Sequence, residues 1–141
     1  MNIEYNFEKI STIEFNWEQI TNWIKTIVEK NGKKVGDLNY IFSNDDYILD
    51  INKKYLNHNY YTDIITFNYV EGNLLSGDIF ISVDTVNENA QHYKVSFENE
   101  LCGVIIHGVL HLIGFDDQNK NDQEEMTKQE NLALDLLEKL K

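Results

Sequence analysis

An apolar segment that ends at Gly114 constrains the fold of this chain more than any other feature. Ser96 is a helix-capping residue, and the residues that follow it as far as Ile113 are mostly apolar. The pattern predicts a core helix that ends at a glycine able to adopt a left-handed backbone. Two histidines, His107 and His111, interrupt its apolar character near the carboxyl-terminal end.

Hydrophobic periodicity predicts the elements around this helix. Four more helices begin near residues 16, 45, 83 and 122 and extend to about residues 32, 56, 93 and 140. Alternating residues predict strands at 38–42, 64–69 and 78–82, of which the last two form a hairpin connected through residues 72–77. With a further strand placed before the first helix, the order is strand, helix, strand, helix, two strands and three helices. It predicts an α+β fold with about five helices packed around a small mixed sheet.

Length and apolar content predict one domain. The chain has 141 residues, of which 42% are hydrophobic, and no repeat, low-complexity tract or linker interrupts it. We therefore expect a single domain over residues 1–141. Helical spacing predicts that Tyr93 and Leu140 are buried, and it places Tyr55 on the apolar stripe of its helix.

The charge balance excludes several classes of protein. The chain has 12 basic residues, all of them lysine, and 24 acidic residues, which gives a net charge of −12 at pH 7. An acidic chain without arginine cannot bind DNA or RNA through a broad basic face. The lone cysteine, Cys102, fits a reducing compartment and excludes an internal disulfide framework. The apolar runs are too short for a membrane span and the amino terminus lacks a signal peptide, so we expect a cytoplasmic protein.

The two histidines have the spacing of metal ligands. His107 and His111 lie one turn apart on one helix face, so both imidazoles can reach one tetrahedral ion. Gly114 then turns the chain and brings Asp116 or Asp117 to the position of a third ligand. A catalytic zinc ion takes three protein ligands and keeps one position open. The alternative is that the histidines are merely packed or exposed, but the glycine and aspartates after them favour a metal site.

The residue after the first histidine excludes one class of zinc enzyme. Zinc peptidases have a glutamate there as the general base, and this chain has Gly108. Two histidines and a carboxylate also describe the iron site of oxygenases, but the chain has no second motif for a co-substrate.

Residues 107–116 resemble the metal helix of the YbeY family of metal-dependent endoribonucleases, whose pattern is H-G-x-L-H-L-x-G-[YF]-D-H. The resemblance covers most of the chain, and it includes the pattern G-D-I-x-I-S at residues 77–82 and the single residues Asn52, Tyr55, Thr62, Asp63, Phe67, Glu100 and Met126. The spacing from His111 to Asp117, with a glycine midway, equals that of zinc proteins with a long motif, so the helix is expected to be zincin-like.

The resemblance implies that His107, His111 and Asp117 bind one Zn²⁺ ion, or another divalent metal in its place. The family has histidine as the third ligand, where this chain has Asp117, and Asp116 is expected to face away. The implied activity is single-strand-specific endoribonuclease cleavage in ribosomal RNA maturation, notably at the small-subunit 3′ end, and in ribosome quality control. The expected partners are RNA and the ribosome or its proteins. The sequence assigns no general base.

Two departures from the family pattern favour an alternative. Leu56 stands where the family has an arginine, which removes a cation that would stabilise the transition state, and Tyr61 replaces a proline. Lys53 and Lys54 are near in sequence but are expected to be solvated. The alternative is a non-catalytic ribosome-assembly factor with a structural metal, although a structural zinc ion normally has four protein ligands.

Several of the remaining polar residues have two interpretations. Asp63 either orients a liganding imidazole or caps the loop before its strand, whereas Asp78 is expected to cap backbone. Tyr60 and Tyr61 are expected to pack in their loop, with stacking on an unpaired base as the alternative. Two isolated histidines, His58 and His92, are expected at the surface. A cluster of lysines either contacts phosphate or balances nearby acidic side chains: Lys30, Lys33 and Lys34.

Overall fold

The computed structural model describes residues 2–56 and 62–141, which form a mixed sheet and five helices. The strands are β1 (Asn2–Phe7), β2 (Lys34–Ser43), β3 (Ile64–Asn68) and β4 (Leu74–Ser82), in the order β1-β2-β4-β3. β2 pairs in parallel with β1 and β4, and β3 pairs antiparallel with β4. The α+β class and the mixed sheet are confirmed.

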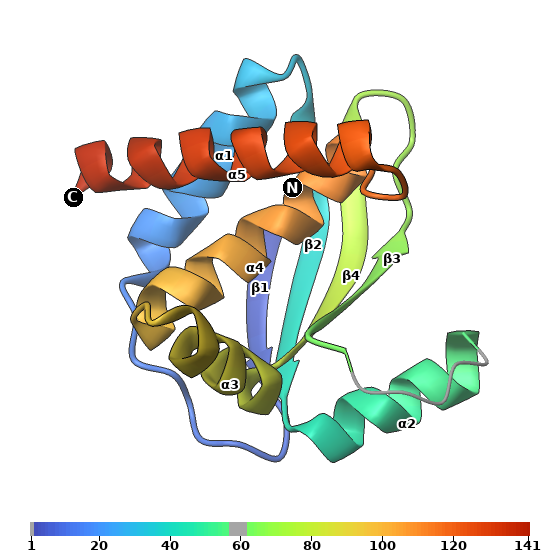
Figure 1. The fold of residues 1–141 in the computed structure, drawn as a ribbon. Coiled ribbons are helices and arrows are strands. Elements are labelled where there is room, and N and C mark those ends of the chain that lie inside the picture. The colour runs from blue at the N-terminus through green and yellow to red at the C-terminus, as the bar shows by residue number, and fades with distance from the viewer. Residues whose placement is uncertain (1, 57–61) are drawn as a thin grey trace.

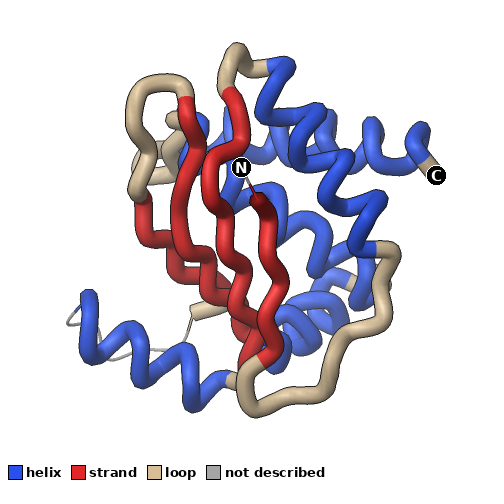
Figure 2. The backbone as a smooth tube through the Cα atoms, turned by 180° about the vertical axis from the view of Figure 1, so that it is seen from behind, coloured by secondary structure: helices blue, strands red, loops and turns tan. Residues whose placement is uncertain are grey.

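Four helices cover one face of the sheet, as Figure 1 shows. They are α1 (Trp17–Lys30), α3 (Val83–Tyr93), α4 (Phe97–Ile113) and α5 (Lys120–Leu140). Seen from behind, the sheet lies in front of these helices (Figure 2). The remaining helix, α2 (Asp45–Leu56), contacts the other face through Tyr47 against Phe80 and Tyr55 against Phe67. Among the described residues, no helix is long and apolar enough to cross a membrane.

Helix α4 is held in the centre of the core. Leu101, Ile105 and Val109 are fully buried, and the hydroxyl of Tyr40 on β2 donates a hydrogen bond to the carbonyl of Ile105 at 3.1 Å. Burial of so much apolar surface stabilises the helix far more than its intrinsic propensity does. Side chains on α4 that face away from the sheet therefore project from a rigid support.

The structure corrects several predicted boundaries. β4 begins at Leu74, so Gly77 lies within a strand, and the hairpin turn is at residues 71–74 rather than 72–77. β2 begins at Lys34, four residues before the predicted start. α5 begins at Lys120, two residues early, because Asn119 rather than a later residue caps it by accepting the Asp122 N–H.

Three residues on predicted apolar helix faces are exposed, and two of them, Tyr93 and Leu140, were predicted to be buried. Tyr55, Tyr93 and Leu140 are 66%, 62% and 45% exposed. Each lies at or beside the last residue of its helix, where the helical spacing continues but the helix no longer has the core beneath it. Cys102 is buried, and burial raises the pKa of its thiol to about 12.

Candidate metal centre

The ends of α4 determine where its two histidines lie. Its first turn is capped by Ser96, whose side chain accepts a hydrogen bond from the Asn99 N–H at 3.0 Å. It ends at Gly114, which has φ +127°, a value that L side chains rarely adopt, and whose N–H bonds to the carbonyls of Leu110 and His111. His107 and His111 lie on one face of the last turns, with ring centroids 4.6 Å apart.

Gly108 faces the sheet. It is buried, and a Cβ atom there would lie 3.1 Å from the Cδ1 atoms of both Ile64 and Ile79. A side chain at this position would therefore have to displace these two isoleucines. A glutamate there, as in zinc peptidases, would also place its carboxylate against this apolar surface.

We predict that Gly108→Glu destabilises the protein by about 3–5 kcal/mol, because it buries an unpaired carboxylate against two isoleucines. Gly103→Glu is the matched control on the same helix, since a Cβ atom at Gly103 meets nothing within 4 Å. Urea unfolding of both variants measures the difference. Equal free energies of unfolding for the two variants would show that the contact with the isoleucines does not exclude a side chain at residue 108.

Asp117 completes a cluster with the two histidines. Its Oδ2 atom lies 3.5 Å from Nε2 of His107 and 3.4 Å from Nε2 of His111. One ligand atom from each residue lies within 4.8 Å of the others. Tetrahedral ligands at zinc–ligand bonds of about 2.0–2.1 Å are about 3.4 Å apart, so the three residues fit one ion. Their side chains are 21–43% exposed, which leaves a side of the cluster open.

Asp116 is not part of the cluster. Its Oδ1 atom accepts a hydrogen bond from the Asp117 N–H at 2.8 Å, and the Asp117 carbonyl accepts one from Gln123 Nε2 at 3.0 Å. These two bonds hold the turn after Gly114 so that the Asp117 side chain faces the histidines. Of the two aspartates that the sequence offered, the structure brings Asp117 to the histidines.

Glu130 on α5 supports His107, and no sequence pattern indicated this role. Its Oε2 atom lies 3.0 Å from Nδ1 of His107. A carboxylate can only accept, so Nδ1 donates to Glu130, and Nε2, which a metal ion would take as its ligand atom, faces Asp117. Burial alone would lower the pKa of His107, but the hydrogen bond and charge of Glu130, with Asp117 and Asp63, outweigh it and raise that pKa. Glu130 has no motif, so only its spatial position reveals it.

We predict that Glu130→Gln lowers divalent-metal affinity by about 10–100-fold, the usual cost of losing the partner of a liganding histidine. In the metal-free protein it should also lower the pKa of His107, because burial remains while a negative charge is lost. Chelator competition measures the affinity and NMR titration of the imidazole measures the pKa. Glu124→Gln, an exposed change on the same helix, is the control, and equal behaviour of both variants would contradict the role of Glu130.

Further acidic side chains surround the cluster. Burial raises the pKa of Asp63, and the opposing effects of His107 and of the Asp63 and Ile64 backbone N–H groups only partly offset it. These backbone hydrogen bonds support the capping interpretation of Asp63, and the imidazole of His107 is oriented by Glu130 instead. Burial, then the charges of Asp63 and Glu130, also raise the pKa of Glu100.

Two grooves meet at the cluster. The first, of about 420 Å³, lies between α3, α4 and α5, and we call it the helical groove. The second, of about 660 Å³, runs beside β3 and is called the β3 groove. His107, Asp117 and Asp63 line both of them. Leu56 and Thr62 also line the β3 groove, and no lysine is among the described residues that line either groove.

Most of the other polar residues that the sequence offered as candidates lie away from the cluster. Lys54 pairs with Asp50 at 3.5 Å, and Lys53 lines a separate hollow, so neither reaches the cluster. Asp78 does not cap backbone, because its Oδ1 atom accepts a hydrogen bond from Asn39 Nδ2 at 3.0 Å. As expected, His92 is exposed. Three residues, His58, Tyr60 and Tyr61, lie outside the described part of the chain.

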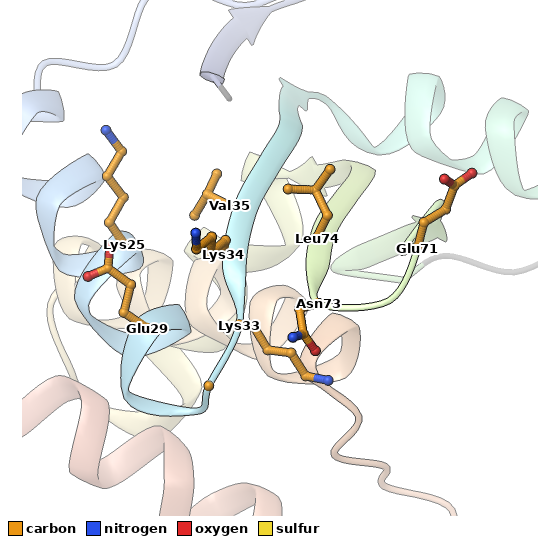
Figure 3. Close-up of a pocket in the computed structure, with 9 residues that line it drawn as sticks. Lys25, Glu29, Lys33, Lys34, Val35, Glu71, Asn73 and Leu74 are labelled. Carbon is orange, nitrogen blue, oxygen red and sulfur yellow. The ribbon is translucent and has the colours of Figure 1, made fainter.

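The predicted lysine cluster borders a hollow of about 860 Å³ (Figure 3). Lys25 and Glu29 lie on its α1 side and Leu74 on its β4 side, with β2 between them. Lys33 and Lys34 line it and Lys30 does not. Glu29 and Glu71 line it together with three lysines, so its lining carries two negative and three positive side chains.

Comparison with known proteins identifies the family. A family model described as Endoribonuclease YbeY matches residues 3–138. The chain belongs to the YbeY family. A Parabacteroides distasonis protein named Endoribonuclease YbeY is 47% identical over 97% of this chain and 96% of its own. A Flavobacterium johnsoniae protein of the same name is 43% identical over 91% of each chain.

A solved structure of similar fold supports the architecture. A Thermotoga maritima protein whose structure was determined in solution has a TM-score of 0.68 and 26% sequence identity, covering 94% of this chain and 88% of its own. The resemblance noted in the sequence is therefore confirmed at the level of the family and of the fold.

Proposed function

We propose that this member of the YbeY family is a metal-dependent endoribonuclease that cleaves single-stranded RNA, acting in ribosomal RNA maturation at the small-subunit 3′ end and in ribosome quality control. The observation that carries the proposal is the convergence of His107, His111 and Asp117 at the junction of two grooves. The name that these relatives share, Endoribonuclease YbeY, supports the same activity. We further propose that residues 1–141 act as one domain, in the cytoplasm.

His107, His111 and Asp117 are the proposed ligands, and two nitrogens with one carboxylate suit Zn²⁺ or another divalent metal. When bound, such an ion supplies Lewis-acid polarisation of a phosphoryl oxygen or activation of water for phosphodiester hydrolysis. Glu130 holds His107 in the tautomer that presents Nε2. The hydrogen bonds of Asp116 and Gln123 hold the turn that carries Asp117.

The two grooves suit an RNA strand that continues on both sides of the reacting phosphate. A strand can leave the cluster along the helical groove in one direction and along the β3 groove in the other, which is the requirement of internal rather than terminal cleavage. No lysine is among the described residues that line the grooves, so they offer no broad basic face to a duplex, which favours a single strand. The protein has a net charge of −12 at pH 7, which repels RNA. We therefore propose that the ribosome or a ribosomal protein helps to deliver the RNA.

The alternative is a ribosome-assembly factor with a structural metal. Leu56 is 39% exposed in the β3 groove, so an apolar side chain lies where a cation would assist phosphoryl transfer. The open side of the cluster favours the enzyme, because structural zinc sites are closed by four ligands.

Metal analysis together with cleavage of a single-stranded RNA, with and without chelator, tests the proposal. We expect one metal ion per chain and cleavage that a chelator abolishes and added metal restores. Bound metal without cleavage would favour the assembly factor. Cleavage that is insensitive to complete metal removal would overturn the metal-dependent mechanism.

A further inference from the structure

The helical groove extends well beyond the reacting centre. From His107 it follows α4 for two turns to Glu100, about 10 Å along the helix axis. Its floor between them is Gly103, where a Cβ atom would meet nothing within 4 Å. The space above the helix is therefore open from the cluster to Glu100, and none of the steps proposed above uses the far end.

The groove presents hydrogen-bonding groups that the fold does not use. Asn89, Asn99 and Asn131 come from three different helices, and within the described part of the chain their carboxamides have no hydrogen-bond partner. Tyr93 lines the same groove and is 62% exposed, which leaves ring surface free for a flat ligand. A volume of about 420 Å³ accommodates a nucleoside.

The charge of the groove selects which part of a nucleotide can enter. Asp63, Glu100 and Glu130 line it, and no lysine does among the described lining residues. These carboxylates repel phosphate, whereas they accept hydrogen bonds from N–H donors on the edge of a base. A neutral base rich in donors fits, and its phosphate remains outside towards the metal cluster.

Guanine matches these groups best. Its N1–H and N2–H donors are adjacent and can both reach one carboxylate, while adenine and cytosine offer a single exocyclic amino group and uracil only N3–H. Its O6 and N7 atoms accept hydrogen bonds from a carboxamide. We propose that the helical groove is a guanine-binding subsite, in which Glu100 accepts from N1–H and N2–H, Asn99 or Asn131 donates to the opposite edge and Tyr93 stacks on the ring.

A basic protein side chain also offers paired donors to a carboxylate. The base is favoured over such a partner because the groove joins the β3 groove at His107 and Asp117, where an RNA strand must pass. The aromatic ring and the three carboxamides also suit a planar heterocycle with both donors and acceptors. This subsite rests on the proposed ribonuclease function.

The cleavage test uses uridine oligonucleotides that contain one internal guanosine. The parent protein should cut beside the guanosine about 10–100-fold faster than between uridines, since one good bidentate pair gives discrimination of that order. Replacing guanosine with inosine, which lacks N2–H, should remove most of this preference. Glu100→Gln should cut all linkages within about threefold of one another, because an amide cannot accept both donors. Glu88→Gln, an exposed change on α3, should keep the preference.

A binding test separates this proposal from the ribonuclease function. Guanosine titrated into the protein should shift backbone amide NMR signals at Asn99, Glu100 and Gly103 in the parent and not in Glu100→Gln, whether or not RNA is cleaved. If RNA is not cleaved but these shifts occur, the subsite stands and the ribonuclease function fails. Cleavage without base preference, a preference unchanged in Glu100→Gln, or shifts caused by arginine amide but not guanosine would each overturn the subsite.

Discussion

Replacement of His107 or His111 by alanine should abolish stoichiometric zinc binding and lower RNA cleavage by at least about 1,000-fold. Both imidazoles have Nε2 within 3.5 Å of the same Asp117 oxygen, so neither can be lost without leaving only two ligands. The helix should remain folded, because its stability comes from the buried face that contacts the sheet. Metal content after dialysis against a mild chelator measures the loss, and circular dichroism monitors the helix.

His92→Ala provides the matched control for these variants. His92 is exposed on α3, where its ring contacts Tyr93 and lies outside the cluster. This change should leave metal content at the parental level. Full zinc occupancy in either His107→Ala or His111→Ala would show that the metal binds elsewhere.

Replacement of Asp117 by alanine should cost more than about 100-fold in metal affinity, whereas Asp116→Ala should cost no more than the 10–100-fold typical of a residue that only positions a ligand. The Asp117 carboxylate faces both histidines, and the Asp116 carboxylate accepts a backbone N–H in the turn. Isothermal titration with Zn²⁺ gives both affinities. A larger loss for Asp116→Ala would mean that the two aspartates exchange roles.

Asp117→His tests the same position by replacing the ligand rather than removing it. It installs the third histidine of the family pattern, so zinc should remain bound while Asp117→Ala loses it. A neutral imidazole also removes one negative charge from a site that already has Asp63 and Glu130 beside it. Loss of zinc in Asp117→His equal to that in Asp117→Ala would show that this turn cannot present a longer side chain to the ion.

Local sequence patterns were sufficient for the helices and for the centre of each internal strand. Ser96 and Gly114 mark the two ends of α4 because capping depends on a few neighbouring residues, and both ends lie where the sequence predicted. The start of β4 was missed because Gly77 suggests a turn, whereas in the sheet it lies beside the carbonyl of Phe67 and the side chain of Leu112. Such a neighbour is remote in sequence and leaves no periodic signal.

For the candidate metal centre, the sequence by itself determined that two imidazoles share a helix face and that a carboxylate follows a glycine turn, because these relations depend on helix geometry and on adjacent residues. Tertiary structure decided that Asp117 rather than Asp116 faces the histidines, since the direction of each side chain depends on the hydrogen bonds of the turn. It also decided that Glu130, 23 residues beyond His107, supports that imidazole and that two grooves meet there. These features arise from packing between α3, α4, α5 and β3, and packing brings together residues whose separation along the chain carries no local pattern.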